Sequence, residues 1–64
     1  WLSPLIEELS PDYRAVVHLF YYEGLSTREI SRLIRQKEST VRMRLTRARR
    51  LLKMKIEGEN NDVE

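Results

Sequence analysis

The stretch TVRMRLTRARRLLK, residues 40–53, holds five arginines, one lysine and no acidic residue. Apolar residues recur in it and just beyond it at intervals of four, three, four and four positions: Val41, Leu45, Ala48, Leu52 and Ile56. On an α-helix these side chains form one narrow stripe, while the basic side chains occupy both shoulders and much of the outer face. The stretch therefore predicts an amphipathic helix that is anchored by its apolar stripe and shows its cationic side to solvent.

Two Ser-Pro pairs mark the predicted starts of the first two helices. A hydroxyl side chain followed by proline suits the N-cap and the first helical position. The pairs at residues 3–4 and 10–11 predict helices over about 4–9 and 11–23. Gly24 is expected to end the second helix, because glycine adopts the left-handed cap conformation at little steric cost.

A third helix is predicted by the spacing of Ser26 and Glu29. In a capping box of this kind, each side chain bonds the backbone N–H of the other residue. The helix should run over about 27–34 and bury Ile30 and Leu33, with Ile34 as a further candidate.

The basic helix is predicted over about 38–57, with Gly58 as its stop signal. Four helices without β-type alternation indicate an all-α, four-helix compact domain, whose third and fourth helices have helix-turn-helix proportions. The domain is expected to span residues 1–57, and the acidic stretch 58–64 to be a disordered tail. Because the chain begins at Trp1 rather than at methionine, we expect it to be cut from a longer protein.

The composition excludes several classes of protein. There is no cysteine, which excludes a disulfide framework and thiolate zinc sites. No apolar run approaches about 18 residues, so no membrane span is predicted. The only histidine is His18, and the adjacent Glu7 and Glu8 would not face each other on a helix. We therefore expect a protein that is not an enzyme and has no catalytic residue, metal site or cofactor.

Charge is distributed unevenly along the chain. Residues 28–55 contain eleven basic and two acidic residues, whereas the flanking segments are acidic on balance. From Val41 to Lys55 seven basic residues occur without an acid, although like charges at i,i+4 spacing destabilise a helix. This concentration favours a polyanionic partner, above all nucleic acid. A solvated surface, a membrane surface and an acidic protein groove remain as alternatives.

A basic helix that enters the major groove uses its N-terminal turns to read base edges and its flanks to contact phosphates. Arginine donates two hydrogen bonds to guanine, and apolar atoms of methionine or threonine suit the thymine methyl group. The predicted base-reading residues are Arg42, Met43, Thr46 and Arg47. Open N–H groups at the start of the helix suit a phosphate. The predicted phosphate-contacting residues are Arg28, Arg35, Lys37, Ser39, Thr40, Arg44, Arg49 and Arg50.

Two longer segments carry a family pattern, SPDYRAVVHLFYYEGLSTREISRL at residues 10–33 and TVRMRLTRARRLL at residues 40–52. They resemble region 4 of bacterial sigma-70-type factors, most closely the extracytoplasmic-function group. The matching pieces are Pro11, Tyr13-Arg14, Val16 to Tyr22, Glu23 to Ser26, Glu29-Ile30, Thr40-Val41, Arg42, Arg44-Leu45 and Arg47-Ala48-Arg49. The ordered set covers about residues 5–55 and is more specific than any single piece.

The resemblance implies a function. Region 4 of such factors binds the promoter −35 element through its helix-turn-helix and docks on the flap of the RNA polymerase β subunit. A cytoplasmic protein of transcription initiation is therefore implied, with promoter DNA and RNA polymerase as partners and an anti-sigma protein as a further one. The family's base-reading positions fall on Arg42, Met43, Thr46 and Arg47 in this chain.

The turn before the basic helix departs from the family pattern. The family commonly has glycine, an apolar residue and a serine-like cap, and this chain has Arg35, Gln36 and Lys37. A non-glycine residue held at positive φ costs on the order of 1 kcal/mol. We therefore expect either strain at this turn, with Ser39 as the replacement N-cap, or a rebuilt turn.

Three aromatic residues, Phe20, Tyr21 and Tyr22, lie at the end of the second predicted helix. For the two tyrosines we expect packing in the core. The alternative is an exposed apolar patch, because such patches mark docking surfaces. In the family that the chain resembles, polymerase or an anti-sigma protein would occupy that patch.

Two functions of other classes stay open. A helix-turn-helix domain of a response-regulator-type transcription regulator would bind as a dimer at paired half-sites. A protein-interaction module would bind an acidic partner through the basic helix. Monomeric binding to a single −35-like site would favour the sigma factor over both.

Overall fold

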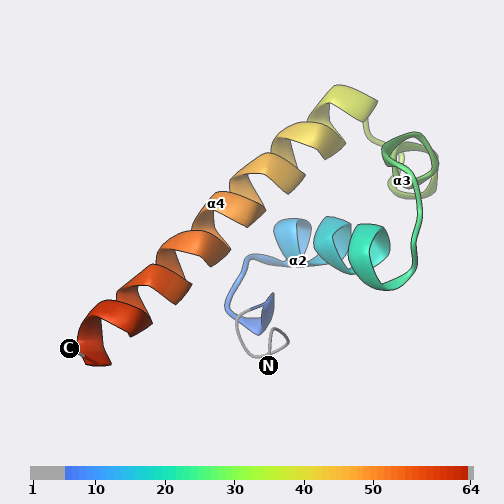
Figure 1. The fold of residues 1–64 in the computed structure, drawn as a ribbon. Coiled ribbons are helices and arrows are strands. Elements are labelled where there is room, and N and C mark those ends of the chain that lie inside the picture. The colour runs from blue at the N-terminus through green and yellow to red at the C-terminus, as the bar shows by residue number, and fades with distance from the viewer. Residues whose placement is uncertain (1–5, 64) are drawn as a thin grey trace.

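The computed structural model describes the backbone of residues 6–63 and the side chains of residues 6–57. Figure 1 shows its elements: α2 (Pro11–Val17), the π-helix η1 (His18–Tyr22), α3 (Thr27–Ile34) and α4 (Glu38–Val63). These residues contain no strand, which confirms the all-α prediction. The long helix α4 packs against both α2 and α3, and α3 lies near its N-terminal end (Figure 1).

The predicted count of four helices is wrong, because the described residues form three α-helices. The first predicted helix, over about 4–9, begins outside the described part, and from residue 6 onward its backbone is helical at residues 6–7 alone. The chain then turns, with the Leu9 N–H donating to the Ile6 carbonyl at 3.0 Å.

Pro11 starts α2 and also explains the early end of the segment before it. Proline disfavours helical backbone in the residue that precedes it, and Ser10 is extended with φ −60° and ψ 156°. Ser10 occupies the predicted N-cap position, although its side chain makes no capping hydrogen bond. Its carbonyl accepts the first helical bond, from the Arg14 N–H at 2.9 Å.

The second predicted helix, over about 11–23, changes its hydrogen-bond pattern halfway along. α2 ends at Val17, and η1 continues the segment with π-helical hydrogen bonds. At the end of η1 the Glu23 N–H donates to the His18 carbonyl at 3.2 Å. Because a π-helix bonds i to i+5, side chains beyond Val17 no longer follow the α-helical stripe. Gly24 follows with φ 71°, the left-handed conformation that its sequence position predicts.

The core lies between α4 and the shorter segments. The apolar stripe predicted for α4 is confirmed, with four of its members buried and Ile56 packed half-buried against them. The buried residues are Ile6, Leu9, Val16, Val17, Ile30, Val41, Leu45, Ala48 and Leu52. Because this stripe faces α2 and α3, the opposite side of α4 faces solvent.

The prediction that α3 buries Leu33 is wrong, since this side chain is 61% exposed. Ile30 is buried, and Ile34 packs half-buried against the same core. These two residues are four positions apart and therefore share one face of the helix. α3 has eight residues, and only this narrow face packs against the core. Leu33 lies outside that face.

α4 continues through the predicted stop at Gly58 and ends at Val63, so the predicted helix end is wrong. Glycine destabilises a helix interior by about 1 kcal/mol. A helix that has already formed can still continue through it, because extending a helix is far easier than starting one. At a rise of roughly 1.5 Å per residue, its 26 residues account for most of the 44 Å length of the molecule. The division into a domain over 1–57 and an acidic tail over 58–64 stays a prediction. None of the helices in the described part has the length and apolar character needed to cross a membrane.

Candidate nucleic-acid interface

Of the two alternatives expected for the turn between α3 and α4, the structure shows the strained one. Arg35 adopts the left-handed conformation, with φ 58° and ψ 45°. Among the described residues it is the one non-glycine residue with positive φ. The Gln36 N–H closes the turn by donating to the Ser31 carbonyl at 3.0 Å. A short, fixed turn of this kind sets the angle between the two helices of a helix-turn-helix.

The expectation that Ser39 replaces the N-cap of α4 is wrong, because the helix already begins at Glu38. The Val41 N–H donates to the Lys37 carbonyl at 3.1 Å, so Lys37 precedes the first turn. An acidic residue in the first turn suits the positive end of the helix dipole. The N–H groups of this turn have no partner within the helix, which keeps the predicted phosphate site at Ser39 and Thr40 available.

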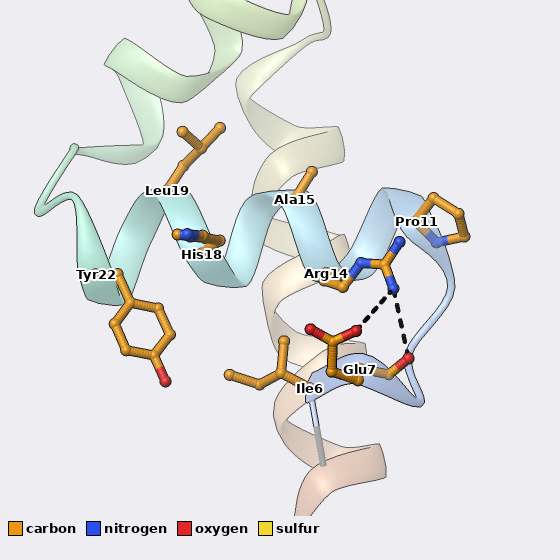
Figure 2. Close-up of a pocket in the computed structure, with 8 residues that line it drawn as sticks. All are labelled: Ile6, Glu7, Pro11, Arg14, Ala15, His18, Leu19 and Tyr22. Carbon is orange, nitrogen blue, oxygen red and sulfur yellow. Dashed lines mark hydrogen bonds and ion pairs between the residues drawn. The ribbon is translucent and has the colours of Figure 1, made fainter. Parts of the chain in front are cut away.

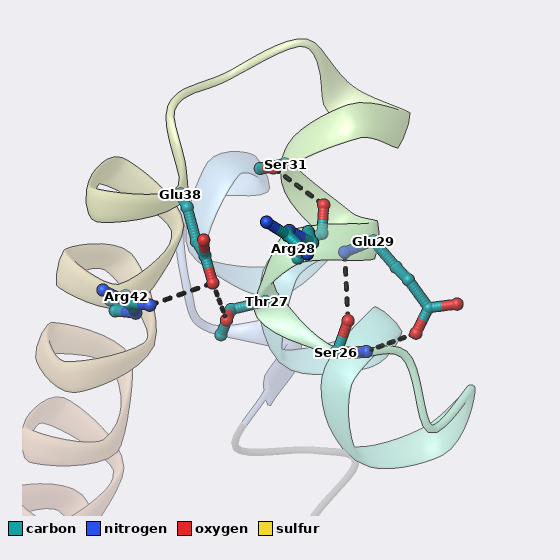
Figure 3. Close-up of polar contacts among 7 residues, drawn as sticks. All are labelled: Ser26, Thr27, Arg28, Glu29, Ser31, Glu38 and Arg42. Atoms are coloured by element: carbon teal, nitrogen blue, oxygen red, sulfur yellow. Dashed lines mark hydrogen bonds and ion pairs between the residues drawn. The ribbon is translucent and has the colours of Figure 1, made fainter.

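The capping box predicted at the start of α3 is confirmed (Figure 3). The Glu29 N–H donates to the Ser26 hydroxyl oxygen at 3.1 Å, and the Ser26 N–H donates to Glu29 Oε1 at 2.9 Å. The bond from the Ser26 N–H is the main cause that lowers the pKa of the Glu29 carboxyl. This box fixes the first turn of α3, where Thr27 and Arg28 lie.

Glu38 joins α3 to α4 (Figure 3). Its Oε2 accepts from the Thr27 hydroxyl at 2.7 Å and from Arg42 Nη2 at 3.0 Å. The bond from Thr27 is the main cause that lowers the pKa of the Glu38 carboxyl, and the positive charges of Arg42 and Arg28 lower it further, against partial desolvation. The carboxylate therefore stays charged at neutral pH, between the first turns of the two helices.

The four predicted base-reading residues lie on the first three turns of α4 and are all exposed. Arg42, Met43, Thr46 and Arg47 all face solvent, and the apolar Met43 is 38% exposed. The burial of Val41 and Leu45 between them explains this exposure, because the four residues lie on the shoulder and the outer face of an amphipathic helix whose apolar stripe is buried. Their role in base reading stays a prediction.

The predicted phosphate-contacting residues surround this face. Thr40 and Arg44 are half-buried, and the others are exposed: Arg28, Arg35, Lys37, Ser39, Arg49 and Arg50.

The domain's own acids leave most of this cationic side open. In the segment whose side chains are described, residues 6–57, the ion pairs that involve α4 are Arg42–Glu38 at 3.0 Å, Lys53–Glu57 at 4.0 Å and Lys55–Glu8 at 3.5 Å. The arginines on the outer face of α4 beyond Arg42 therefore remain available to a polyanion.

Thr27 and Glu38 lie beside the predicted base-reading residue Arg42, and the sequence did not single them out. The spacing of Glu38 and Arg42 is i,i+4, which is a recognised signal for an ion pair on a helix. The bond to Thr27 joins residues eleven positions apart, and no periodicity predicts it.

The tyrosines beside this helix form a second exposed feature. Tyr21 and Tyr22 are 50% and 54% exposed, so the expectation that they pack in the core is wrong. The π-helical turns of η1 move them off the α-helical stripe. The Tyr21 ring packs edge-on against Phe20 with centroids 5.0 Å apart, and the Arg49 guanidinium lies 6.0 Å from its centroid. Tyr22 packs edge-on against His18 at 5.1 Å.

A groove of about 600 Å³ runs along α2 and η1 and contains no residue of α4 (Figure 2). Its lining is mostly apolar, from Ile6, Pro11, Ala15, Leu19 and Tyr22. At its polar side, Arg14 Nη1 lies 3.4 Å from the Glu7 carbonyl, to which it donates, and 3.8 Å from the Glu7 carboxylate. None of the predicted DNA-contacting residues lines this groove, so the domain has two separate candidate surfaces.

Comparison with known proteins agrees with this arrangement. The family described as Sigma-70, region 4 matches residues 1–52. No curated protein and no solved structure matches the chain. The match covers most of the 64 residues, including α2, α3 and the basic half of α4, and the family is one of DNA-binding rather than catalytic domains. The chain therefore belongs to the sigma-70 region 4 family.

Proposed function

We propose that this domain recognises the −35 element of promoters as part of a sigma factor of the extracytoplasmic-function group, which directs RNA polymerase in the cytoplasm. One observation carries the proposal. The N-terminal half of α4 holds its apolar stripe in the core and shows a line of exposed residues rich in arginine, on the second helix of a helix-turn-helix. Membership of the family supports the same function.

In the proposed complex, the first turns of α4 lie in the major groove. Arg42 and Arg47 donate pairs of hydrogen bonds to guanine O6 and N7. Met43 and the methyl group of Thr46 contact a thymine methyl group. These four residues alternate with Val41 and Leu45, so the helix is held by its core side while the other side reads bases.

Phosphate contacts on both flanks would hold the helix at this depth. Arg28 is at the start of α3, Arg35 and Lys37 are in the turn, and Arg44, Arg49 and Arg50 are on α4. The first turn of α4 adds its open N–H groups near Ser39 and Thr40. These contacts give affinity and orientation, whereas the base contacts give sequence preference.

The second proposed partner is the RNA polymerase core, through the flap of its β subunit. The exposed tyrosines of η1 and the apolar groove along α2 support a protein partner, because exposed apolar surface marks docking sites. This surface shares no residue with the predicted base-reading set, so promoter DNA and polymerase bind the domain at the same time. An anti-sigma protein is a further proposed partner for the same surface.

Selection of binding sites from a pool of randomised duplexes tests the proposed function. We expect the 64-residue chain to bind as a monomer and to select one short consensus that recurs in promoters at the −35 position. Dimeric binding to paired half-sites would instead indicate a response-regulator-type protein. Equal affinity for all duplexes, together with tight binding to an acidic protein, would indicate an interaction module.

A further inference from the structure

Arg42 is the one predicted base-reading arginine that is held by an acid within the described part of the domain. Its Nη2 donates to Glu38 Oε2 at 3.0 Å, and its side chain is still 65% exposed. The guanidinium has five N–H donors in a rigid plane. One bond to Glu38 therefore restricts where the guanidinium can lie and leaves most of its other donors open to solvent.

Glu38 is itself held in place by the neighbouring helix. Its Oε2 accepts from the Thr27 hydroxyl at 2.7 Å, and Thr27 is the first residue of α3, directly after the N-cap Ser26. The Glu38 side chain is only 34% exposed. The hydrogen bond from Thr27 and the charge of Arg42 lower the pKa of Glu38, so the carboxylate is charged and its bond to the guanidinium is charge-assisted.

We propose that Glu38 is a specificity-determining positioning residue, which holds the Arg42 guanidinium so that its remaining N–H groups meet one base edge. This inference rests on the proposed function of the domain. A long arginine side chain that is free in solution must be ordered when it binds. The bonds from Thr27 to Glu38 and from Glu38 to Arg42 order it before DNA arrives, and Glu38 acts through Arg42 rather than by touching a base.

Arg47 provides an internal comparison for this role. It is the second predicted base-reading arginine, and the residue four positions before it is Met43, which has no charge. It takes part in no ion pair among the side chains of residues 6–57. The base position that Arg47 reads should therefore not depend on Glu38.

The test compares selections from a randomised duplex pool for the wild-type chain and for Glu38→Ala, Arg42→Ala, Arg47→Ala and the double variant of Glu38 and Arg42. We expect Glu38→Ala to weaken the base preference about two- to tenfold, the range for losing the preorganisation of one long side chain. The weakened position should be the one that Arg42→Ala also weakens, and the position weakened by Arg47→Ala should be unchanged. The double variant should be no less selective than Arg42→Ala alone, because the two residues act in series.

Two further variants separate positioning from a general effect on charge or folding. Glu57→Ala removes the acid of another i,i+4 pair of α4, with Lys53 at 4.0 Å, and should leave every base preference unchanged. Thr27→Val should reproduce part of the loss of base preference seen for Glu38→Ala. Thr27→Ser keeps the hydroxyl group and should therefore show the wild-type base preference. Thermal melts establish that each variant is folded.

The outcomes distinguish this inference from the proposed function. If the wild-type chain selects a consensus and Glu38→Ala selects the same one, the positioning role is overturned and promoter recognition stands. Higher affinity of Glu38→Ala for all duplexes, with unchanged preferences, would also overturn it, since Glu38 would then act only by repelling phosphates. A wild-type chain that selects no consensus would overturn the proposed function and this inference together.

Discussion

At the scale of single residues, exposed arginines of α4 have different predicted tasks although they look alike in the sequence. Arg47 lies on the side of the helix that would enter the groove, and Arg50 lies one turn further along. A contact to a base edge changes sequence preference, whereas a contact to a phosphate changes affinity for every duplex alike. Substitution therefore separates the two tasks.

Arg47→Ala should weaken binding to the selected duplex by roughly 1–3 kcal/mol and relax the preference at one base pair. Equilibrium binding to the consensus duplex and to its single-base variants measures both effects. Arg50→Ala is the matched control, because a lost phosphate contact should weaken all duplexes by a similar factor. A uniform loss for Arg47→Ala as well would make Arg47 a backbone contact.

Arg35 combines a predicted phosphate contact with a backbone conformation that is unfavourable for folding. Its left-handed backbone, with φ 58°, is one that glycine adopts without a steric penalty. Arg35→Gly should stabilise the folded domain by about 0.5–1 kcal/mol, after allowing for the greater freedom of glycine in the unfolded chain. It should also weaken DNA binding through the lost phosphate contact.

Urea unfolding and duplex binding measure these opposite effects of Arg35→Gly. Arg35→Ala is the control, because it removes the same charge and keeps a Cβ atom in the left-handed conformation. It should weaken binding equally without the gain in stability. Equal unfolding midpoints for the two variants would show that the backbone of Arg35 is not a source of strain.

At the scale of the elements, two kinds of contact hold the helix-turn-helix together. The first is apolar, since the stripe of α4 packs on α2 and α3. The second is polar and local to the first turns of α3 and α4, where Thr27, Glu38 and Arg42 meet. The apolar contacts supply most of the stability, and the polar ones fix the relative position of the two helices.

Leu45→Ala should remove about 2–5 kcal/mol of stability, because Leu45 is 1% exposed and its truncation leaves a cavity. Small domains have only a few kcal/mol in total, so we expect the cooperative unfolding transition to be shifted strongly or lost. Leu51→Ala makes the same chemical change on the same helix at a residue 38% exposed. Circular dichroism during thermal unfolding should show a much smaller shift for it, and equal shifts would contradict the assigned position of the stripe.

The link between α3 and α4 should depend on pH. The pKa of Glu38 is lowered from its ordinary value of 4.5 by the Thr27 hydroxyl and by Arg42. A carboxyl group whose pKa is lowered by folding stabilises the folded state above its unfolded pKa, and the contribution is lost as pH falls through the folded pKa. The lowered pKa of Glu29 acts in the same direction.

We therefore expect the melting temperature to fall as pH drops below about 4.5. Glu38→Gln resembles the protonated carboxyl group, so this variant should be less stable than the wild type at neutral pH. The two melting temperatures should converge in acid. Parallel curves over the whole range would show that ionised Glu38 does not link the helices.

At the scale of the whole molecule, the charge lies on one part of an elongated domain. α4 supplies most of the 44 Å length and has most of the basic residues on its exposed side, while the apolar groove lies on α2 and η1. Binding to DNA should therefore release counterions without involving the groove. If about five phosphates are neutralised, the logarithm of the affinity should fall with the logarithm of the salt concentration at a slope near −4.5. Titration with salt measures this slope, and a value shallower than about −1 would contradict the proposed phosphate contacts.

Signals that act within a few residues predicted much of this fold and of its candidate site. The stripe of α4, the capping box at Ser26 and the left-handed Gly24 depend on spacing or on backbone preference, and all three are confirmed. The missing glycine in the next turn left strain or a rebuilt turn as alternatives, and the positive φ of Arg35 corresponds to the first. The exposed face of α4 could be predicted in turn, because it is the part of the helix outside the buried stripe.

Tertiary packing alone decided the rest. A short helix packs only the face that meets its neighbours, which left Leu33 in solvent, and the π-turn after Val17 moved Tyr21 and Tyr22 to the surface. Residues 27 and 38 meet because the turn folds one helix against the next. Periodicity determines which side chains share a face, but which of them are buried and what they contact depends on the elements that lie opposite in space.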